Sequence, residues 1–229
     1  MPEPLEILPD PLPAEPLALL EHWLADAWRH RHQPNPNAMV LATCDAAGRP
    51  SARVVLCKEV VVRPGYLVFY TNYGSHKGRE LAQNPRAATV FHWDHLHRQV
   101  RIEGAVVKTP EADSDAYFAS RPWQSRLGAW ASAQSEPTPS RAALRSSLAA
   151  AARRFGVPEP DRPEVGGDLD LVIPRPPHWG GYQLWVDSVE LWVEGEARIH
   201  DRARWNRPLR AIPGDTFTPG AWTTTRLQP

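Results

Sequence analysis

Short apolar segments separated by turn residues constrain the fold of this chain more than any other feature. They are rich in Val and Tyr, which favour strands, and turns are expected at Asp45–Gly48 and at Pro64-Gly65. Strands of this length and spacing are typical of an antiparallel barrel or sandwich. The expected strands span residues 38–45, 51–62, 66–72, 87–93, 98–109, 182–193 and 221–229.

Helical patterns flank these strands. Leu17, Leu20 and Trp23 begin an apolar stripe at three- and four-residue steps, which predicts a helix from Glu15 to Arg31. Capping residues predict three further helices, at 75–84, 109–120 and 138–156. Two irregular segments are also expected, a small-residue linker at 128–137 and a polar loop at 203–221. The fold class is therefore mainly β with flanking helices (α+β).

Proline marks the expected boundaries. The 25 prolines are concentrated at the N-terminus and around residues 157–177. Residues 1–16 are expected to form an extended arm, and residues 17–229 a single domain that contains a long Pro-rich loop at 157–177.

Charge and composition argue against several classes of protein. The 26 basic residues balance 26 acidic ones, whereas a general binder of nucleic acid or of membrane surfaces carries a basic excess. No apolar run reaches the length of a membrane span and no signal-peptide pattern opens the chain, so a cytoplasmic protein is expected. Cys44 and Cys57 favour core positions, and His92, His95 and His97 favour a polar turn over a zinc site, so no metal is expected.

Two segments suit an anionic ligand. Ser75 is a candidate N-cap beside Gly74 and Lys77, and a helix N-terminus of this kind can bind phosphate, although many turns contain Gly and Ser. Tyr117 and Arg121 are four residues apart, so a phenol and a guanidinium share a helix face, and the Ser125 hydroxyl follows. The alternative for this second segment is a surface helix end with an Arg matched to the helix dipole.

The segment Leu191–Arg202 (LWVEGEARIHDR) carries a third cationic group. On an extended strand Arg198, His200 and Arg202 would share one face, and two cations flanking an imidazole suit an anionic or redox-active ligand. The alternative is a solvated edge strand with charged residues that prevent aggregation.

Seven motifs, in order, resemble those of the pyridoxine/pyridoxamine 5′-phosphate oxidases. They are RVVLCK, FYTNYGSHK, RQVRIEG, YFASRPWQSRLGAWASAQS, HWGGYQLW, VELWVEGEARIHDR and RLQP. The resemblance implies an FMN-binding split β-barrel and a homodimer with FMN at the subunit interface. It implies that pyridoxine 5′-phosphate and pyridoxamine 5′-phosphate are oxidised to pyridoxal 5′-phosphate, with O2 as acceptor and H2O2 as product, and with ammonia released from the amine.

The resemblance also implies site residues. The implied FMN contacts are Arg53, Lys58, Tyr70, Thr71, Ser75, His76, Lys77, Gln99, Gln134, Ser135, Trp192 and Arg202. The implied substrate contacts are Lys58, Tyr117, Arg121, Ser125, Arg198 and His200, of which Arg198 and His200 would lie at the reacting carbon as catalytic residues.

The chain departs from the family pattern in two places. His76 stands where an arginine is expected, which would make one phosphate contact weaker or sensitive to pH. The N-terminal arm lacks the Arg- and Tyr-bearing segment that covers the substrate in some members. Arg53 and Lys58, five residues apart, would also face opposite sides of one strand unless a bulge intervenes or they contact different parts of the ligands.

Two alternative functions are compatible with the same fold. One is a flavin oxidase of the phenazine pathway, against which the Tyr117, Arg121 and Ser125 group argues because that substrate has no phosphate. The other is a carrier of flavin, haem or pyridoxal phosphate, which would need neither Arg198 nor His200.

Overall fold

The computed structural model describes residues 7–158, 172–214 and 216–229. Most of the predicted loop at 157–177 and the first six residues of the predicted arm lie outside these ranges. The strands are β1 (Ala38–Cys44), β2 (Pro50–Leu56), β3 (Glu59–Val61), β4 (Tyr66–Asn72), β5 (Arg86–Trp93), β6 (Arg98–Lys108), β7 (Trp179–Val193), β8 (Asp201–Asn206), β9 (Leu209–Ile212), β10 (Thr216–Pro219) and β11 (Thr223–Leu227).

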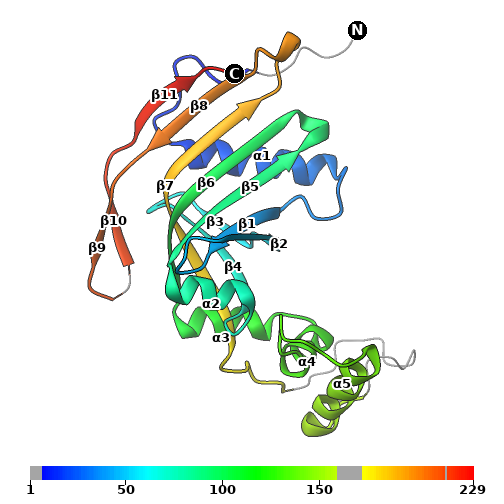
Figure 1. Ribbon diagram of the computed structural model, residues 1–229. Helices are drawn as coiled ribbons and strands as arrows, with labels where there is room; N and C mark the ends of the chain where they lie inside the picture. The colour runs from blue at the N-terminus through cyan, green and yellow to red at the C-terminus, as the bar shows by residue number, and fades with distance from the viewer. Residues whose placement is uncertain (1–6, 159–171, 215) are drawn as a thin grey trace.

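Nine of these strands form one antiparallel sheet that curls into a half-barrel (Figure 1). The order is β11-β8-β7-β6-β5-β1-β2, and β4, which carries β3, pairs with β7. The remaining strands, β9 and β10, form a hairpin that projects from one side. The predicted fold class, a mainly β split barrel with flanking helices, is therefore confirmed.

The predicted strand at 51–62 is two strands. The Cys57 N–H bonds to the carbonyl of Asn37, on the β1 side, whereas the next N–H, of Lys58, bonds to Val68 in β4. The chain thus changes partner between β2 and β3. Arg53 and Lys58 therefore do not share one strand, and the expectation that they face opposite sides of it no longer applies.

β7 links the two ends of the molecule. Its first half pairs with β4 and its second half with β8, while β6 pairs with it from Tyr182 to Val193. The β6–β7 register shifts between Glu103 and Gly104. A Cβ at Gly104 would lie 1.9 Å from the Trp185 carbonyl oxygen, so the close approach of the backbones at this bulge requires glycine.

Five α-helices flank the sheet, together with the 3₁₀ turns η1 (Asp94–Leu96) and η2 (Glu196–Arg198). The helices are α1 (Pro16–His30), α2 (His76–Gln83), α3 (Glu111–Ala119), α4 (Trp123–Ala131) and α5 (Arg141–Phe155). The predicted α1 is confirmed: Glu15 caps it and its apolar stripe is buried in the main core with the inner side chains of the sheet.

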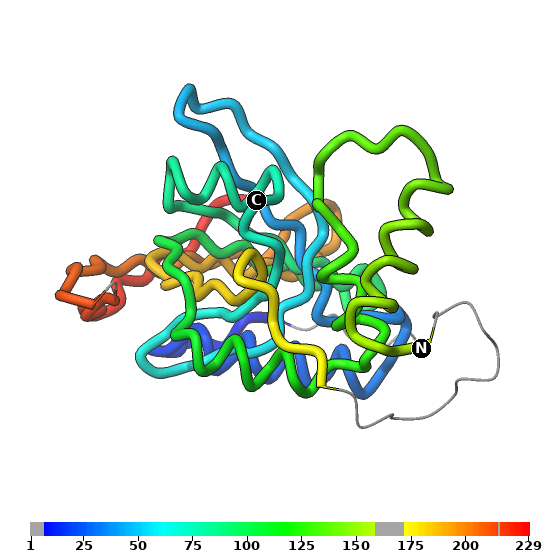
Figure 2. The backbone as a smooth tube through the Cα atoms, turned by 90° about the horizontal axis from the view of Figure 1, so that it is seen from below, coloured from blue at the N-terminus to red at the C-terminus, as the bar shows by residue number. Residues whose placement is uncertain are grey.

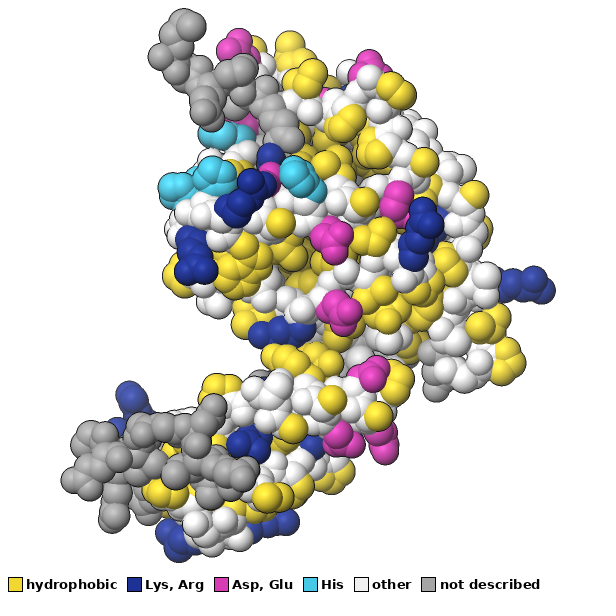
Figure 3. Space-filling model, turned by 180° about the vertical axis from the view of Figure 1, so that it is seen from behind, with side chains coloured by type: hydrophobic (Ala, Val, Ile, Leu, Met, Phe, Trp, Pro, Cys, Tyr) yellow, Lys and Arg dark blue, Asp and Glu magenta, His cyan; other side chains and the backbone are white. Residues whose placement is uncertain are grey.

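A smaller lobe is built from α3, α4 and α5. Viewed from below, α4 and α5 lie on the side of the sheet opposite the β9–β10 hairpin (Figure 2), and a constriction separates the two lobes in the space-filling view (Figure 3). The lobe has its own core, in which Phe118, Trp123 and Leu127 are buried against Trp179 at the start of β7.

Three predictions in this lobe were wrong in detail. The linker predicted at 128–137 begins as the last turn of α4, because Trp123 and Leu127 pack into the lobe core and alanine favours the helix. The N-cap of α5 is Ser140 rather than Thr138. Thr109 does not cap α3 either, because its hydroxyl bonds with that of Ser114, 2.8 Å away.

The C-terminal region contains more strand than predicted. The polar loop expected at 203–221 holds most of β8 and the whole β9–β10 hairpin, because Ala203 and Trp205 alternate with polar residues and are fully buried. The described part of the N-terminal arm packs beside β8: the Leu8 N–H bonds to Asp201 and the Trp205 indole to the Pro13 carbonyl, both at 2.8 Å.

No helix among the described residues is long and apolar enough to cross a membrane.

Candidate active site

A pocket of about 800 Å³ lies where the sheet meets the smaller lobe. Its walls come from β2, β4, α2, α3, α4 and the start of β7. Ten of the residues predicted for the site lie at this end of the molecule. Those that line the pocket are Arg53, Lys58, Tyr70, Thr71, Lys77, Tyr117, Arg121, Ser125 and Gln134, while Ser75 lies just behind Lys77.

Lys77 is a buried cation in the wall of the pocket. Its ammonium donates to Gln134 at 2.9 Å, to Thr71 at 3.1 Å and to the Ser75 hydroxyl at 3.2 Å. Burial, and then the nearby charge of Arg53, lower the pKa of Lys77 to about 8. All its described hydrogen-bond partners are neutral, so no negative charge nearby stabilises the ammonium. A bound anion would do so and would raise the pKa of Lys77 toward its ordinary value.

Ser75 holds the start of α2 behind this lysine. Its hydroxyl donates to the Asn72 carbonyl at 2.7 Å and accepts from the Gly78 N–H at 3.3 Å. The predicted N-cap is therefore confirmed, and α2 directs its N-terminus and Lys77 toward the pocket.

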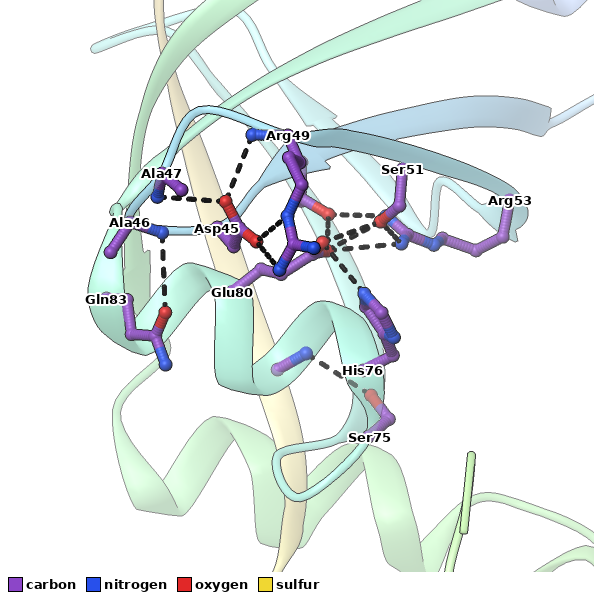
Figure 4. A network of polar contacts seen from close by, with 12 residues as sticks. Asp45, Ala46, Ala47, Arg49, Ser51, Arg53, Ser75, His76, Glu80 and Gln83 are labelled. Atoms are coloured by element: carbon purple, nitrogen blue, oxygen red, sulfur yellow. Dashed lines mark hydrogen bonds and ion pairs between the residues drawn. The ribbon is translucent and has the colours of Figure 1, made fainter. Parts of the chain in front are cut away.

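Arg53 is held beside Lys77 by a network of polar contacts (Figure 4). One guanidinium nitrogen donates to the Leu41 carbonyl at 3.2 Å and the other to the buried carboxylate of Glu80 at 3.3 Å. Burial raises the pKa of Glu80, but hydrogen bonds from Thr43, Ser51 and His76 outweigh that effect and lower it. Glu80 is therefore ionised, and it keeps a second strong cation in place next to the first.

Aromatic rings form the opposite wall. Tyr70 stacks on Tyr117 with ring centroids 3.9 Å apart and on Trp179 at 5.5 Å. Burial, followed by the charge of Asp113, raises the pKa of the Tyr70 phenol to about 12, so the phenol stays neutral and can donate.

Arg121 lies over this wall with unused bonding capacity. Its guanidinium carbon is 4.7 Å from the Trp179 ring centroid, and one of its Nη atoms is buried without any hydrogen-bond partner among the described residues. Burial lowers the pKa of Arg121, but a guanidinium stays charged in proteins. Arg121 follows the C-cap of α3 instead of lying within the helix as predicted, yet it lines the same pocket as Tyr117, Lys58 and Ser125. An unpaired buried donor of this kind fits an anionic ligand.

Five other predicted residues form a second group near the far end of β7. Gln99, Trp192 and Arg202 are direct neighbours across β6, β7 and β8, so their side chains share one face of the sheet. Arg202 is fixed by the buried carboxylate of Glu190 at 2.7 Å and by the Gln228 carbonyl at 2.9 Å. The His200 ring lies 4.7 Å from the Trp192 ring, which brings His200 into the same group.

The prediction that Arg198, His200 and Arg202 share one face of a strand was wrong. Arg198 ends the turn η2, both Ala197 and Arg198 have positive φ (52° and 66°), and only Arg202 lies in β8. The turn is so tight that a Cβ at Gly195 would lie 1.8 Å from the Ile199 carbonyl oxygen, so this position requires glycine. Arg198 is exposed, whereas His200 is half-buried and accepts a hydrogen bond at Nδ1 from the Gly195 N–H, 3.2 Å away.

The two groups are far apart within one chain. Trp179 lines the pocket at the first residue of β7 and Trp192 lies near its last. At about 3.3 Å per residue they are roughly 40 Å apart along the strand. No residue of the second group lines the pocket. His76 and Ser135 do not line it either: His76 contacts Glu80, and Ser135 is exposed.

Sequence reasoning missed three residues that shape the site. Trp179 completes the aromatic wall, and Ser51 and Glu80 hold Arg53. Glu80 could have been found, because it lies four residues after His76 on a helix that was predicted. Ser51 could not, because the Arg53 network depends on contacts between β2 and α2.

A curled antiparallel sheet with a cationic pocket at its edge defines the class of FMN-binding split barrels. A pyridoxamine 5′-phosphate oxidase-related FMN-binding protein from Nostoc punctiforme has the same fold, with a TM-score of 0.63 and 18% identity over 93% of this chain and 96% of that one. This chain belongs to the pyridoxine/pyridoxamine 5′-phosphate oxidase family. Residues 26–153 match the family model described as pyridoxamine 5′-phosphate oxidase, and residues 179–229 match its C-terminal dimerisation region.

Curated relatives and a solved structure agree with this assignment. The chain is 49% identical to the pyridoxine/pyridoxamine 5′-phosphate oxidase of Paraburkholderia phymatum, over 93% of this chain and 89% of the relative. The corresponding protein of Burkholderia orbicola is 47% identical, over 94% and 89%. PhzG from Burkholderia lata 383, solved with tetrahydrophenazine-1-carboxylic acid, is 32% identical with a TM-score of 0.76, over 95% and 94%.

The family membership confirms two expectations. It confirms that the chain is an oxidoreductase of this family with FMN as its cofactor. The match of residues 179–229 to a dimerisation region supports the expected homodimer. The roles of individual site residues, and the substrate, stay predictions.

Proposed function

We propose that this protein oxidises pyridoxine 5′-phosphate and pyridoxamine 5′-phosphate to pyridoxal 5′-phosphate, with FMN as cofactor and O2 as electron acceptor. One observation carries the proposal: four cations line the pocket in two pairs. Arg53 lies near Lys77, whose pKa its charge lowers, whereas Lys58 and Arg121 lie over the aromatic rings of Tyr117 and Trp179. A phosphorylated cofactor and a phosphorylated substrate would each need one of these pairs. An oxidase acting on a substrate without phosphate would have no comparable use for the second.

The first group fits the phosphate of FMN. Lys77 and Arg53 supply charge, and the neighbouring Thr71 and Gln134 supply further polar groups. Tyr70 and Ser135 would add contacts from the same chain. The partner subunit's Gln99, Trp192 and Arg202 would contact the flavin from the other side, since these residues cannot reach the pocket of their own chain. His76 would act on the phosphate only indirectly.

The second group fits the phosphate of the substrate. Arg121, Lys58, Tyr117 and Ser125 would hold this non-reacting end, so that its binding energy positions the C4′ carbon against the flavin. Arg121 needs no rearrangement to do so, because stacking on Trp179 already orients it and leaves a buried Nη unpaired.

The catalytic residues would come from the partner subunit. The partner's Arg198 and His200 would lie at C4′ and orient its substituent. Because Nδ1 of His200 accepts the Gly195 N–H, the neutral ring carries its proton on Nε2, which is then free to donate to the substrate.

When bound, FMN supplies the acceptor for the hydride from C4′ and passes the two electrons to O2. The alcohol substrate and O2 then give pyridoxal 5′-phosphate and H2O2. The amine also consumes one water and releases ammonia.

A second candidate is an oxidase of the phenazine type, favoured by the likeness to PhzG. The two candidates differ in what the Arg121 group binds: a phosphate in the first case, and at most a carboxylate in the second.

Anaerobic mixing of the FMN-loaded protein with pyridoxine 5′-phosphate tests the proposal. We expect the visible flavin band to bleach, and to recover with formation of H2O2 when air is admitted. Unphosphorylated pyridoxine should bleach it at least about 100-fold more slowly at equal concentration, the loss expected from one charge-assisted phosphate anchor. Bleaching by tetrahydrophenazine-1-carboxylic acid but not by pyridoxine 5′-phosphate would overturn the proposal in favour of the second candidate. A band that neither substrate bleaches would point to a carrier.

A further inference from the structure

Glu80 lies outside the pocket but at the centre of the contacts behind it (Figure 4). Its side chain is 5% exposed, yet its carboxylate is shared by four groups from β1, β2 and α2. The Ser51 hydroxyl contacts its two oxygens at 2.8 and 2.7 Å, His76 Nε2 lies at 2.9 Å and Arg53 at 3.3 Å, and Thr43 also donates to it. None of the predicted roles accounts for this carboxylate.

These contacts fix the direction of Arg53. One Nη donates to the Leu41 carbonyl at 3.2 Å and to the Thr43 hydroxyl at 2.6 Å, and the other to Ser51 and Glu80. Thr43 and Ser51 bond to Glu80 as well as to Arg53. A guanidinium held on both sides loses little further rotamer freedom when it binds a phosphate.

The same carboxylate reduces the positive charge of the site. Two nearby ion pairs are internally neutral: Asp45–Arg49 at 2.7 Å in the β1–β2 turn, and Arg79–Glu136 at 2.6 Å. The charges that face His76 without such a partner are then Arg53 and Lys77, opposed by Glu80. With a neutral imidazole the balance is one positive charge, whereas a phosphate ester carries about −1.5 to −2 at pH 7.

His76 is largely exposed and does not line the pocket, so it reaches the site only through the carboxylate that it shares with Arg53. A permanent cation at this position would bring the balance to two.

We propose that Glu80 is a positioning residue for the phosphate end of FMN: together with Thr43 and Ser51, it fixes Arg53 before the phosphate binds. This inference rests on the proposed binding of the FMN phosphate at Arg53 and Lys77.

The test measures the Kd of FMN for the apoprotein by quenching of flavin fluorescence. The variants are Glu80→Gln, which keeps the volume of the side chain without its charge, and His76→Arg, which adds a permanent cation. Riboflavin, which lacks the phosphate, is the matched ligand.

We expect Glu80→Gln to weaken FMN binding about fivefold without changing riboflavin binding, because Arg53 is then no longer fixed and loses rotamer freedom when it binds the phosphate. His76→Arg adds a permanent cation beside an intact Glu80, so it should bind FMN about threefold more tightly than wild type. Ser51→Ala removes one shared hydroxyl and leaves all charges, so it should weaken FMN binding about threefold. It serves as the second variant should Glu80→Gln not fold.

Unchanged or tighter FMN binding by Glu80→Gln would overturn the inference while leaving the proposed function intact. Equal loss of FMN and riboflavin binding in both Glu80→Gln and Ser51→Ala would reduce Glu80 to a structural role. A wild-type chain that binds no FMN would overturn this inference and the proposed function together.

Discussion

The two ends of β7 present two different kinds of site. At the Trp179 end the cations are buried and bonded within the chain, Lys77 to three acceptors and Arg53 to a carboxylate. At the Trp192 end Arg202 is held in the same way by Glu190, but Arg198 is exposed and no described residue accepts a hydrogen bond from it.

We interpret this difference as a division of roles, in which the Trp179 end binds phosphates and the Trp192 end acts on the reacting carbon. Groups that hold phosphates profit from being fixed before the ligand arrives, because little entropy is then lost on binding. Arg198 makes no such contacts with the described residues of its chain, which is the state expected of a side chain whose partner lies across a subunit interface. Under the proposed function, neither end forms a complete site without the other.

The largest expected effect is at the exposed end. Arg198→Met should lower kcat for pyridoxine 5′-phosphate by about 1,000-fold, equivalent to about 4 kcal/mol, and change KM less than about threefold. Its stability should not change, because Arg198 has no described partner to lose. Arg210→Met, an exposed site in the β9–β10 hairpin, is the matched control for steady-state kinetics. A variant that raises KM and keeps kcat would show that Arg198 belongs with the binding groups.

The next effect is at the buried end. Arg121→Ala should raise KM about 50-fold, since about 2–2.5 kcal/mol is the expected loss for a charge-assisted hydrogen bond to phosphate, and should leave kcat within about threefold. Turnover of unphosphorylated pyridoxine, although slow, should be unaffected in the same variant. A fall in kcat at constant KM would reverse the roles of the two ends.

The buried end should also respond to alkaline pH. Because burial lowers the pKa of Lys77 to about 8, the ammonium is lost as the pH rises through that value, and phosphate affinity is lost with it. We expect the Kd of FMN to rise about tenfold between pH 7 and pH 9. Lys77→Arg keeps its charge over this range and should remove the rise. Fluorescence titration of both proteins makes the comparison, and a persistent rise in Lys77→Arg would assign it to another group.

The smallest expected effect concerns the turn that carries Arg198, and it tests whether this turn also takes part in phosphate binding. Gly195→Ala places a Cβ against the Ile199 carbonyl, so the turn that carries Arg198 must shift. Turnover should fall about fivefold, while the affinity for pyridoxal 5′-phosphate, measured by equilibrium titration, should stay constant. Glu196→Ala, an exposed side chain in the same turn, should be neutral. Weaker binding of pyridoxal 5′-phosphate by Gly195→Ala would mean that the turn also holds the phosphate.

Much of the fold could be predicted because its signals are local. The apolar stripe and caps of α1, the Ser75 cap of α2 and the alternation of the β-strands each follow from neighbouring residues. The break between β2 and β3 could not, because it reflects a change of partner from β1 to β4 that no local pattern encodes. The end of α4 was mistaken for a linker because its small residues fit either structure, and only packing of Leu127 decides between them.

The candidate site was predictable in its residue types but not in its geometry. The alternation of Arg198, His200 and Arg202 holds only for an extended chain, and the positive φ of Ala197 and Arg198 breaks it. The polar network around Glu80 joins α2 to the β1–β2 hairpin, so Thr43, Ser51 and Arg53, which precede Glu80 by 37, 29 and 27 residues, could not be grouped with it from spacing. The division of the site between the two ends of β7 likewise appears only once the strand is built.

The length of β7 has a consequence for inheritance. If each site takes its pocket from one subunit and its Arg198 from the other, two different defective alleles can restore full activity to some sites when they are expressed together. A mixed dimer of an Arg121→Ala chain and an Arg198→Met chain has one site with both defects and one site with neither. With random pairing, about a quarter of all sites would be intact. The same two substitutions on a single allele would leave none, so the physical span of one strand decides which pairs of mutations complement each other.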